Sequence, residues 1–80
     1  MDKLRIDKWL WAARFYKTRS LATDEINKGR IEVNQQMAKP AREVKTGDTV
    51  SMRREGQLRT VLVLGLSDVR GPAPKAQLLY

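Results

Sequence analysis

The sequence predicts an α+β fold in which two N-terminal helices pack on a small, mostly antiparallel sheet. Apolar residues recur at helical spacing up to Gly29, and after it they alternate with polar residues. Turn-forming residues then divide the second part of the chain into short segments that suit hairpins. Eighty residues can form one domain with a small core, so we expect a single domain over residues 1–80.

The first helix is predicted to begin at Asp7, a favoured N-cap residue, and to carry the aromatic stretch at residues 9–16. Four of the chain's five aromatic residues lie in this stretch. A small domain needs their apolar area for its core, so we expect most of them to be buried. Trp11 and Tyr16 are the two that we expect nearest to the surface.

A second helix is predicted between Thr18 and Gly29. Thr18 is a favoured N-cap residue, and glycine is favoured just after a helix because it adopts a left-handed backbone conformation without strain. Leu21, Ala22 and Ile26 lie between them at helical spacing and form a narrow apolar stripe. This stripe can face the core of the domain.

After Gly29 the sequence alternates in the manner of strands. Ile31 and Val33 point to one face of a predicted strand at residues 30–34. Further strands are predicted at residues 49–52 and 58–64. Turns or breaks are predicted at residues 34–36, 39–40, 45–48, 55–57 and 71–74. Residues 75–80 then form a short helix or a loose end.

Composition and charge predict an anionic partner. The formal charge is +7 and the pI is near 10.3, which suits RNA, DNA or an acidic membrane surface. No apolar run approaches the ~18 residues of a membrane span, and the first residues lack a signal-peptide core. The chain has no cysteine, which excludes disulfides and thiolate metal sites. We therefore expect a cytoplasmic, monomeric protein that does not enter a membrane.

The residue types that catalysis usually needs are missing. There is no histidine to act as a general base or zinc ligand, and no glycine-rich phosphate loop. Asp24 and Glu25 are neighbours that point about 100° apart on a helix, so they do not form a converging acid pair. We therefore predict a binding protein without catalytic activity, metal or cofactor. A protein-interaction module that uses residues 61–66 is the alternative, although we expect this apolar run to be a buried strand.

Basic residues gather around the predicted start of the second helix. Arg14 and Lys17 precede its N-cap, and Arg19 follows it. A helix N-terminus attracts anions through its free backbone N–H groups and its dipole, and the cations add to that attraction. We therefore predict that these three residues contact nucleic-acid phosphates. Three arginines near the predicted hairpin are instead expected to form a solvated edge: Arg53, Arg54 and Arg59.

A resemblance to a known family makes this interpretation more specific. Residues 5–22 read RIDKWLWAARFYKTRSLA and resemble the opening of the bacterial heat-shock protein fifteen family. The wider pattern resembles the RNA-binding domain named after ribosomal small-subunit protein S-four, also called the alpha-L motif. That pattern covers about residues 4–66 and leaves residues 67–80 as a C-terminal extension. Its elements here are the Arg-x-Asp opening, Gly29, Val33-Asn34, Lys39-Pro40 and Gly47-Asp48.

The resemblance implies an RNA platform built from two helices and a β-hairpin. For the heat-shock family it also implies binding to structured ribosomal RNA or tRNA on the large ribosomal subunit, in stress-stalled complexes that still carry peptidyl-tRNA. The alternative is a stand-alone RNA-binding module of ribosome assembly, or a DNA- or RNA-binding accessory domain without a role in ribosome recycling. The predicted RNA-contact residues are Arg5, Lys8, Arg14, Lys17, Thr18, Arg19, Ser20, Lys28, Arg30, Asn34 and Lys39.

Three features depart from the family pattern. Gln35 occupies a turn position where the family usually has glycine, so we expect a loop of different shape. Asp24 and Glu25 place negative charge on the second helix, so we expect its RNA contacts mainly at the first turn. Family members usually continue into a basic tail, whereas this sequence ends at Tyr80. We expect any ribosome affinity that such a tail supplies to be absent or weaker here.

Overall fold

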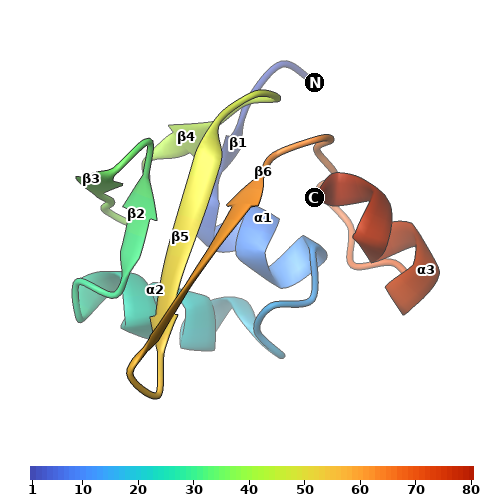
Figure 1. Ribbon diagram of the computed structural model, residues 1–80. Helices are drawn as coiled ribbons and strands as arrows, with labels where there is room; N and C mark the ends of the chain where they lie inside the picture. Colours follow the sequence, from blue (N-terminus) through green and yellow to red (C-terminus); the bar gives the residue numbers. More distant parts are fainter.

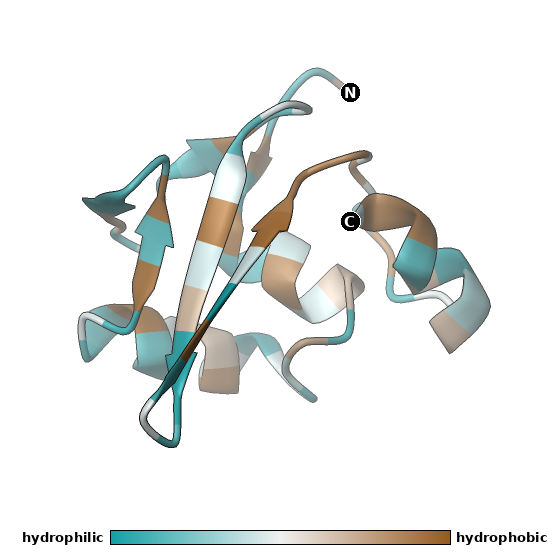
Figure 2. Ribbon diagram, viewed as in Figure 1, coloured by the Kyte–Doolittle hydropathy of each residue, from teal (hydrophilic) through white to brown (hydrophobic).

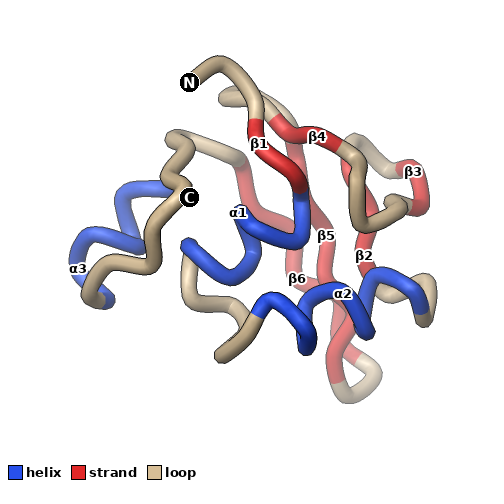
Figure 3. The backbone as a smooth tube through the Cα atoms, turned by 180° about the vertical axis from the view of Figure 1, so that it is seen from behind, coloured by secondary structure: helices blue, strands red, loops and turns tan.

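Two helices cover one face of a four-stranded sheet in the computed structural model, which describes residues 1–80 (Figure 1). The helices are α1 (Ile6–Ala12) and α2 (Arg19–Asn27), and they lie in front of the sheet when the molecule is seen from behind (Figure 3). The sheet has the order β3-β2-β5-β6, with strands β2 (Ile31–Val33), β3 (Gln36–Met37), β5 (Thr49–Arg54) and β6 (Gln57–Leu62). A separate two-stranded sheet consists of β1 (Leu4–Arg5) and β4 (Glu43–Val44). Every strand pair is antiparallel, and the α+β prediction is confirmed.

The start of α1 differs from the prediction because the chain enters the helix directly from strand β1. The backbone N–H of Ile6 donates to the carbonyl of Arg42 (2.7 Å), and the helix begins at Ile6 with Arg5 in the cap position. The prediction that Asp7 is the N-cap was therefore wrong. Asp7 lies inside the first turn, where its carboxylate accepts the N–H of Lys8 (2.8 Å).

The end of α2 has the predicted glycine cap. Gly29 has φ 74°, and its N–H donates to the carbonyl of Ile26 (3.0 Å). The N–H of Arg30 donates to the carbonyl of Glu25 (3.1 Å), which completes a Schellman motif. This confirms that the helix stops where a left-handed residue is available.

Helix α1 ends in the same motif, but without a glycine. Arg14 has φ 66°, its N–H donates to the carbonyl of Trp11, and the N–H of Phe15 donates to the carbonyl of Leu10. A left-handed conformation strains a residue with a Cβ by roughly 1–2 kcal/mol. Arg14 is thus held in a conformation in which glycine would be less strained.

The hairpins of the sheet use tight turns. Strand β2 pairs with β5 so that Ile31 lies opposite Met52. The turn between β2 and β3 has positive φ at Asn34 (51°) and Gln35 (68°), so this loop takes a left-handed conformation without a glycine. In the β5–β6 hairpin Arg54 pairs with Gln57, so the turn is two residues long and β6 begins one residue before the predicted strand.

The core lies between the helices and the inner face of the sheet. The strands show alternating hydropathy, and β5 carries apolar bands between polar ones (Figure 2). Trp9 is completely buried and its Nε1 donates to the carbonyl of Gly65 (3.0 Å). Phe15 and Tyr16 are also buried, which confirms the prediction of an aromatic core. Trp11 is half-buried, as expected, but the prediction of an exposed Tyr16 was wrong.

The C-terminal segment packs onto the domain and is not a loose end. It comprises α3 (Ala73–Ala76), which starts two residues earlier than predicted, and a 3₁₀ turn (Gln77–Leu79). The N–H of Leu64 donates to the carbonyl of Leu79 (2.9 Å), and the ring of Tyr80 contacts that of Phe15 at a centroid distance of 4.6 Å. Residues 61–66 are not the buried strand that we expected, because β6 ends at Leu62 and only Val63 is fully buried. No helix combines the length and the apolar character that a membrane crossing requires.

Candidate nucleic-acid interface

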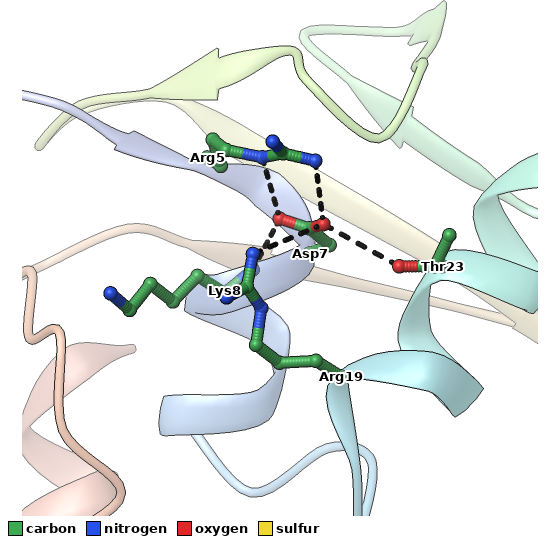
Figure 4. A network of polar contacts seen from close by, with 5 residues as sticks. All are labelled: Arg5, Asp7, Lys8, Arg19 and Thr23. Atoms are coloured by element: carbon green, nitrogen blue, oxygen red, sulfur yellow. Dashed lines mark hydrogen bonds and ion pairs between the residues drawn. The ribbon is translucent and has the colours of Figure 1, made fainter.

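A buried carboxylate organises the basic residues at the junction of β1, α1 and α2. Asp7 is 3% exposed and accepts two hydrogen bonds from Arg5, at 3.2 Å from Nε and 3.0 Å from Nη2. Nη2 of Arg19 lies 3.5 Å from Asp7 Oδ2, and Oγ1 of Thr23 lies 3.4 Å from the same atom. The two arginines approach the carboxylate from different elements, and the side chain of Lys8 extends away from it (Figure 4).

This arrangement leaves positive charge directed at solvent. The side chains of Arg5 and Arg19 are 50% and 43% exposed, so each guanidinium retains N–H groups that face water. One carboxylate shared between two guanidinium groups leaves an excess of one positive charge among these three residues, and the exposed carboxylate of Asp24 lies beside them. Because Asp7 holds both groups, they lose less side-chain freedom when an anion binds.

The N-terminus of α2 adjoins this cluster. Thr18 is extended and its Oγ1 accepts the N–H of Leu21 (3.0 Å), which confirms the predicted N-cap. The other N–H groups of the first turn have no intrahelical acceptor. An open depression of about 320 Å³ lies at this end of the helix. All the residues that line it are of polar or charged type: Asp7, Arg19, Ser20, Thr23 and Asp24.

Arg14 and Lys17 lie on the loop between α1 and α2. Lys17 is exposed and forms no ion pair, so its ammonium group is free for an anion. Arg14 is exposed as well, but its Nε donates to the carbonyl of Gly71 (2.7 Å) in the C-terminal segment. The predicted convergence of Arg14 on the start of α2 is therefore not seen, because the left-handed cap of α1 directs this side chain to the C-terminal segment.

Two further predicted residues lie at the opposite end of α2. Glu25 forms ion pairs with Lys28 (3.6 Å) and Arg30 (3.1 Å), and its side chain is 19% exposed. A nine-residue helix is roughly 13 Å long, so Lys28 and Arg30 are separated from Arg19 by about the length of α2. The fold does not bring these two residues together with Arg5 and Arg19.

Asn34 and Lys39 lie on the side of the molecule formed by β3 and β4. The side chain of Asn34 stabilises its turn: Oδ1 accepts the N–H of Thr49 (3.0 Å) and Nδ2 donates to Asp48 (3.2 Å). Lys39 lines a separate hollow of about 370 Å³ together with Arg42. The side chain of Asn34 therefore stabilises the fold, whereas Lys39 is exposed and free to contact a partner.

Two of the three hairpin arginines contact aromatic rings. Nη1 of Arg54 donates to the carbonyl of Phe15 (3.2 Å), and its guanidinium carbon lies 5.1 Å from the ring centroid of Tyr16. The Tyr16 hydroxyl is buried without a hydrogen-bond partner, and burial raises the pKa of this group against the opposing effect of Arg54. Arg59 lies over the ring of Phe15. Arg53, Arg54 and Arg59 are all exposed, as expected for a solvated edge, but Arg54 and Arg59 also contact aromatic rings.

Sequence reasoning missed two residues of this surface, Asp7 and Thr23. Asp7 was interpreted as a helix cap, although the Arg-x-Asp spacing already places its carboxylate beside Arg5. Thr23 shows no signal in the sequence, because its role follows from the packing of α2 on α1. The carbonyl of Arg42 accepts the N–H of Ile6 at the start of α1, but its side chain lines the hollows near Asn34 and Lys39 and not the depression at Asp7.

Comparison with known proteins gives a consistent result. The pattern of the S4 domain family matches residues 4–50. A heat shock protein 15 homolog of Aeromonas salmonicida is 50% identical over 98% of this chain, and the chain spans 59% of that relative's length. The RQC P-site tRNA stabilizing factor of Helicobacter pylori is 36% identical over 96% of this chain and 92% of its own.

A solved structure agrees with the fold as well. Heat shock protein 15 of Vibrio cholerae superposes with a TM-score of 0.92 at 46% identity, covering 99% of this chain and 80% of that one. That structure is described as trimeric, and a monomeric state of the present chain stays a prediction. Sequence and structure together place this chain in the S4 domain family, in the group that contains heat shock protein 15.

Proposed function

We propose that this chain is a non-catalytic RNA-binding domain that holds structured ribosomal RNA or tRNA on the large ribosomal subunit in stress-stalled translation complexes. The observation that carries this proposal is the pair of arginines held by the buried carboxylate of Asp7 next to the N-terminus of α2. Preorganised cations beside free backbone N–H groups suit the phosphates of a folded RNA. The protein's location is accordingly expected to be that of ribosomes, in the cytoplasm.

The shape of the surface favours structured RNA over single strands. Binding of single strands usually relies on exposed aromatic rings that stack on splayed bases. Here Trp9, Phe15 and Tyr16 are buried. Phosphates and shape are what a folded RNA offers to a rigid surface of cations.

The names of relatives support a role in stress and a contact with tRNA. One group consists of heat shock protein 15 and its homologs, and the other is named for stabilising P-site tRNA. The chain corresponds to about three fifths of the heat shock relatives and to nearly all of the tRNA-stabilising one. We infer that residues 1–80 suffice for contact with the RNA of a large subunit that carries peptidyl-tRNA.

The proposal is tested by binding and contact mapping. The chain is incubated with large subunits, with large subunits that carry peptidyl-tRNA and with small subunits, and bound protein is quantified after sedimentation. Tightest binding to the peptidyl-tRNA complex is expected. Equal binding to all three particles would refute the proposed preference, and crosslinking followed by mapping of the RNA contacts identifies the element bound.

A double variant tests the position of the surface. Changing Lys17 and Arg19 to alanine should weaken binding to large subunits and lower the slope of log affinity against log salt by about one per lost contact. Changing Lys45 and Lys75 removes the same two charges from exposed positions elsewhere. If both double variants lose affinity equally, the attraction is diffuse and the assignment of the surface fails.

A further inference from the structure

Arg54 and Arg59 are held in place by aromatic rings on the inner face of the β5–β6 hairpin. The guanidinium carbon of Arg59 lies 5.2 Å from the ring centroid of Phe15 and 5.6 Å from that of Tyr80. Arg54 lies 5.1 Å from the ring centroid of Tyr16 and bonds the carbonyl of Phe15. Such cation–π contacts orient a guanidinium group without neutralising it.

These two arginines keep their full charge. Neither forms an ion pair with a carboxylate, whereas Arg5, Arg19 and Arg30 all do. Both residues are exposed to solvent. The structure therefore orients two guanidinium groups that form no ion pair, although Glu25 and Glu55 line the same hollow as Arg54.

The hairpin lies close to the surface proposed above. Arg54 is bonded to the loop between α1 and α2, two residues before Lys17. The hairpin extends beyond α2 at the lower edge of the molecule in both views (Figures 1 and 3). Arg54 is thus linked to the loop that carries Lys17, and it lines a hollow together with Arg30, Glu25 and Glu55.

The pairing register separates the two faces of the hairpin. Arg59 pairs with Met52 and Arg54 with Gln57, so these side chains share the inner face with the core residue Met52. Arg53 pairs with Leu58 and belongs to the outer face. Arg53 forms neither an ion pair nor an aromatic contact and is a matched control of the same charge.

We propose that the inner face of the β5–β6 hairpin, through Arg54 and Arg59, is a second contact surface for the phosphate backbone of the same RNA. The proposal rests on the function proposed above and adds an arm to the surface around Asp7. RNA is favoured over an acidic protein because Arg54 is bonded to the loop that carries Lys17, and guanidinium groups with their remaining N–H groups free bind phosphates well.

The first test uses charge variants against large ribosomal subunits. Arg54→Gln and Arg59→Gln should each lower the slope of log affinity against log salt by about one, while Arg53→Gln leaves it near the wild-type value. Arg59→Lys keeps the cation over the rings and should retain most of the slope. Wild-type slopes for both inner-face variants, in folded protein, would overturn the proposal.

A second test leaves both arginines in place. The chain has no cysteine, so Gln57→Cys creates a single position on the inner face for a photo-crosslinking group. Crosslinks to ribosomal RNA are expected from this position and not from Gln77→Cys in the C-terminal segment. Crosslinks from position 57 only to a ribosomal protein, or none at all, would overturn the proposal even if the Arg59 variants were too unstable to measure.

The outcomes distinguish this proposal from the one on which it rests. If the wild-type chain binds no large subunits, the proposed function fails and the hairpin surface fails with it. If the Lys17 and Arg19 double variant weakens binding while the inner-face variants and the crosslinks show no effect, only the hairpin surface is refuted.

Discussion

Asp7→Asn separates the positioning of cations from their charge. The substitution keeps the size of the side chain but removes one negative charge, so the formal charge rises from +7 to +8. If RNA binding depended on diffuse attraction alone, this variant would bind more tightly and with a steeper salt dependence. If Asp7 holds Arg5 and Arg19 in a productive arrangement, binding should instead become weaker.

The effect on stability follows from the contacts of the carboxylate. The amide oxygen of asparagine can still accept the N–H of Lys8, but its NH₂ group then replaces Oδ2, which faces Arg5 at 3.0 Å and Arg19 at 3.5 Å. A hydrogen bond to a charged group contributes about 1.5–3 kcal/mol, and the half-exposed arginines regain water. We therefore expect a loss of about 2 kcal/mol, and a Tm lower by about 8–16 °C for a domain of this size.

The assay compares Asp7→Asn with Asp24→Asn. Asp24 lines the same depression, is exposed and accepts no side-chain hydrogen bond, so its substitution raises the charge equally without releasing an arginine. Salt-dependent affinity for large subunits is measured well below the lower Tm. Asp24→Asn should bind as well as the wild type or better. Equal or tighter binding by Asp7→Asn would refute the positioning role of Asp7.

Three further predictions concern the backbone, the core and the partner. Gly29→Val should lower the Tm by roughly 4–16 °C, because φ 74° strains a β-branched residue by about 1–2 kcal/mol. Gly71→Ala is the control: an added Cβ would make only ordinary contacts there, so the Tm measured in the same way should hardly change. Tyr16→Phe should be neutral or stabilising, because the hydroxyl has no partner. Since the folded pKa of Tyr16 is raised, the unfolded chain ionises first and wild-type stability should fall as pH rises above about 10, less so in Tyr16→Phe. An RNA hairpin should outcompete its unfolded equivalent at one salt concentration, and a preference for the single strand would contradict the rigid surface.

Local chemistry let the sequence determine the boundaries of the second helix and the class of partner. A threonine cap and a left-handed glycine act within a few residues, so Thr18 and Gly29 could be recognised without knowledge of the fold. Net charge is a sum over the chain, and the expectation of an anionic partner needs no coordinates. The position of Arg19 at the helix start followed from the same cap.

Only the tertiary structure decided which cations lie together. The cluster around Asp7 joins Arg5 to Arg19 across α1 and α2, and the carboxylate is buried because the two helices pack over it. Arg14 was assigned to the same surface from its place in the sequence, but the cap of α1 turns it towards Gly71. Local patterns describe what neighbours in the chain can do, whereas the direction of a long side chain depends on contacts between residues that are distant in sequence.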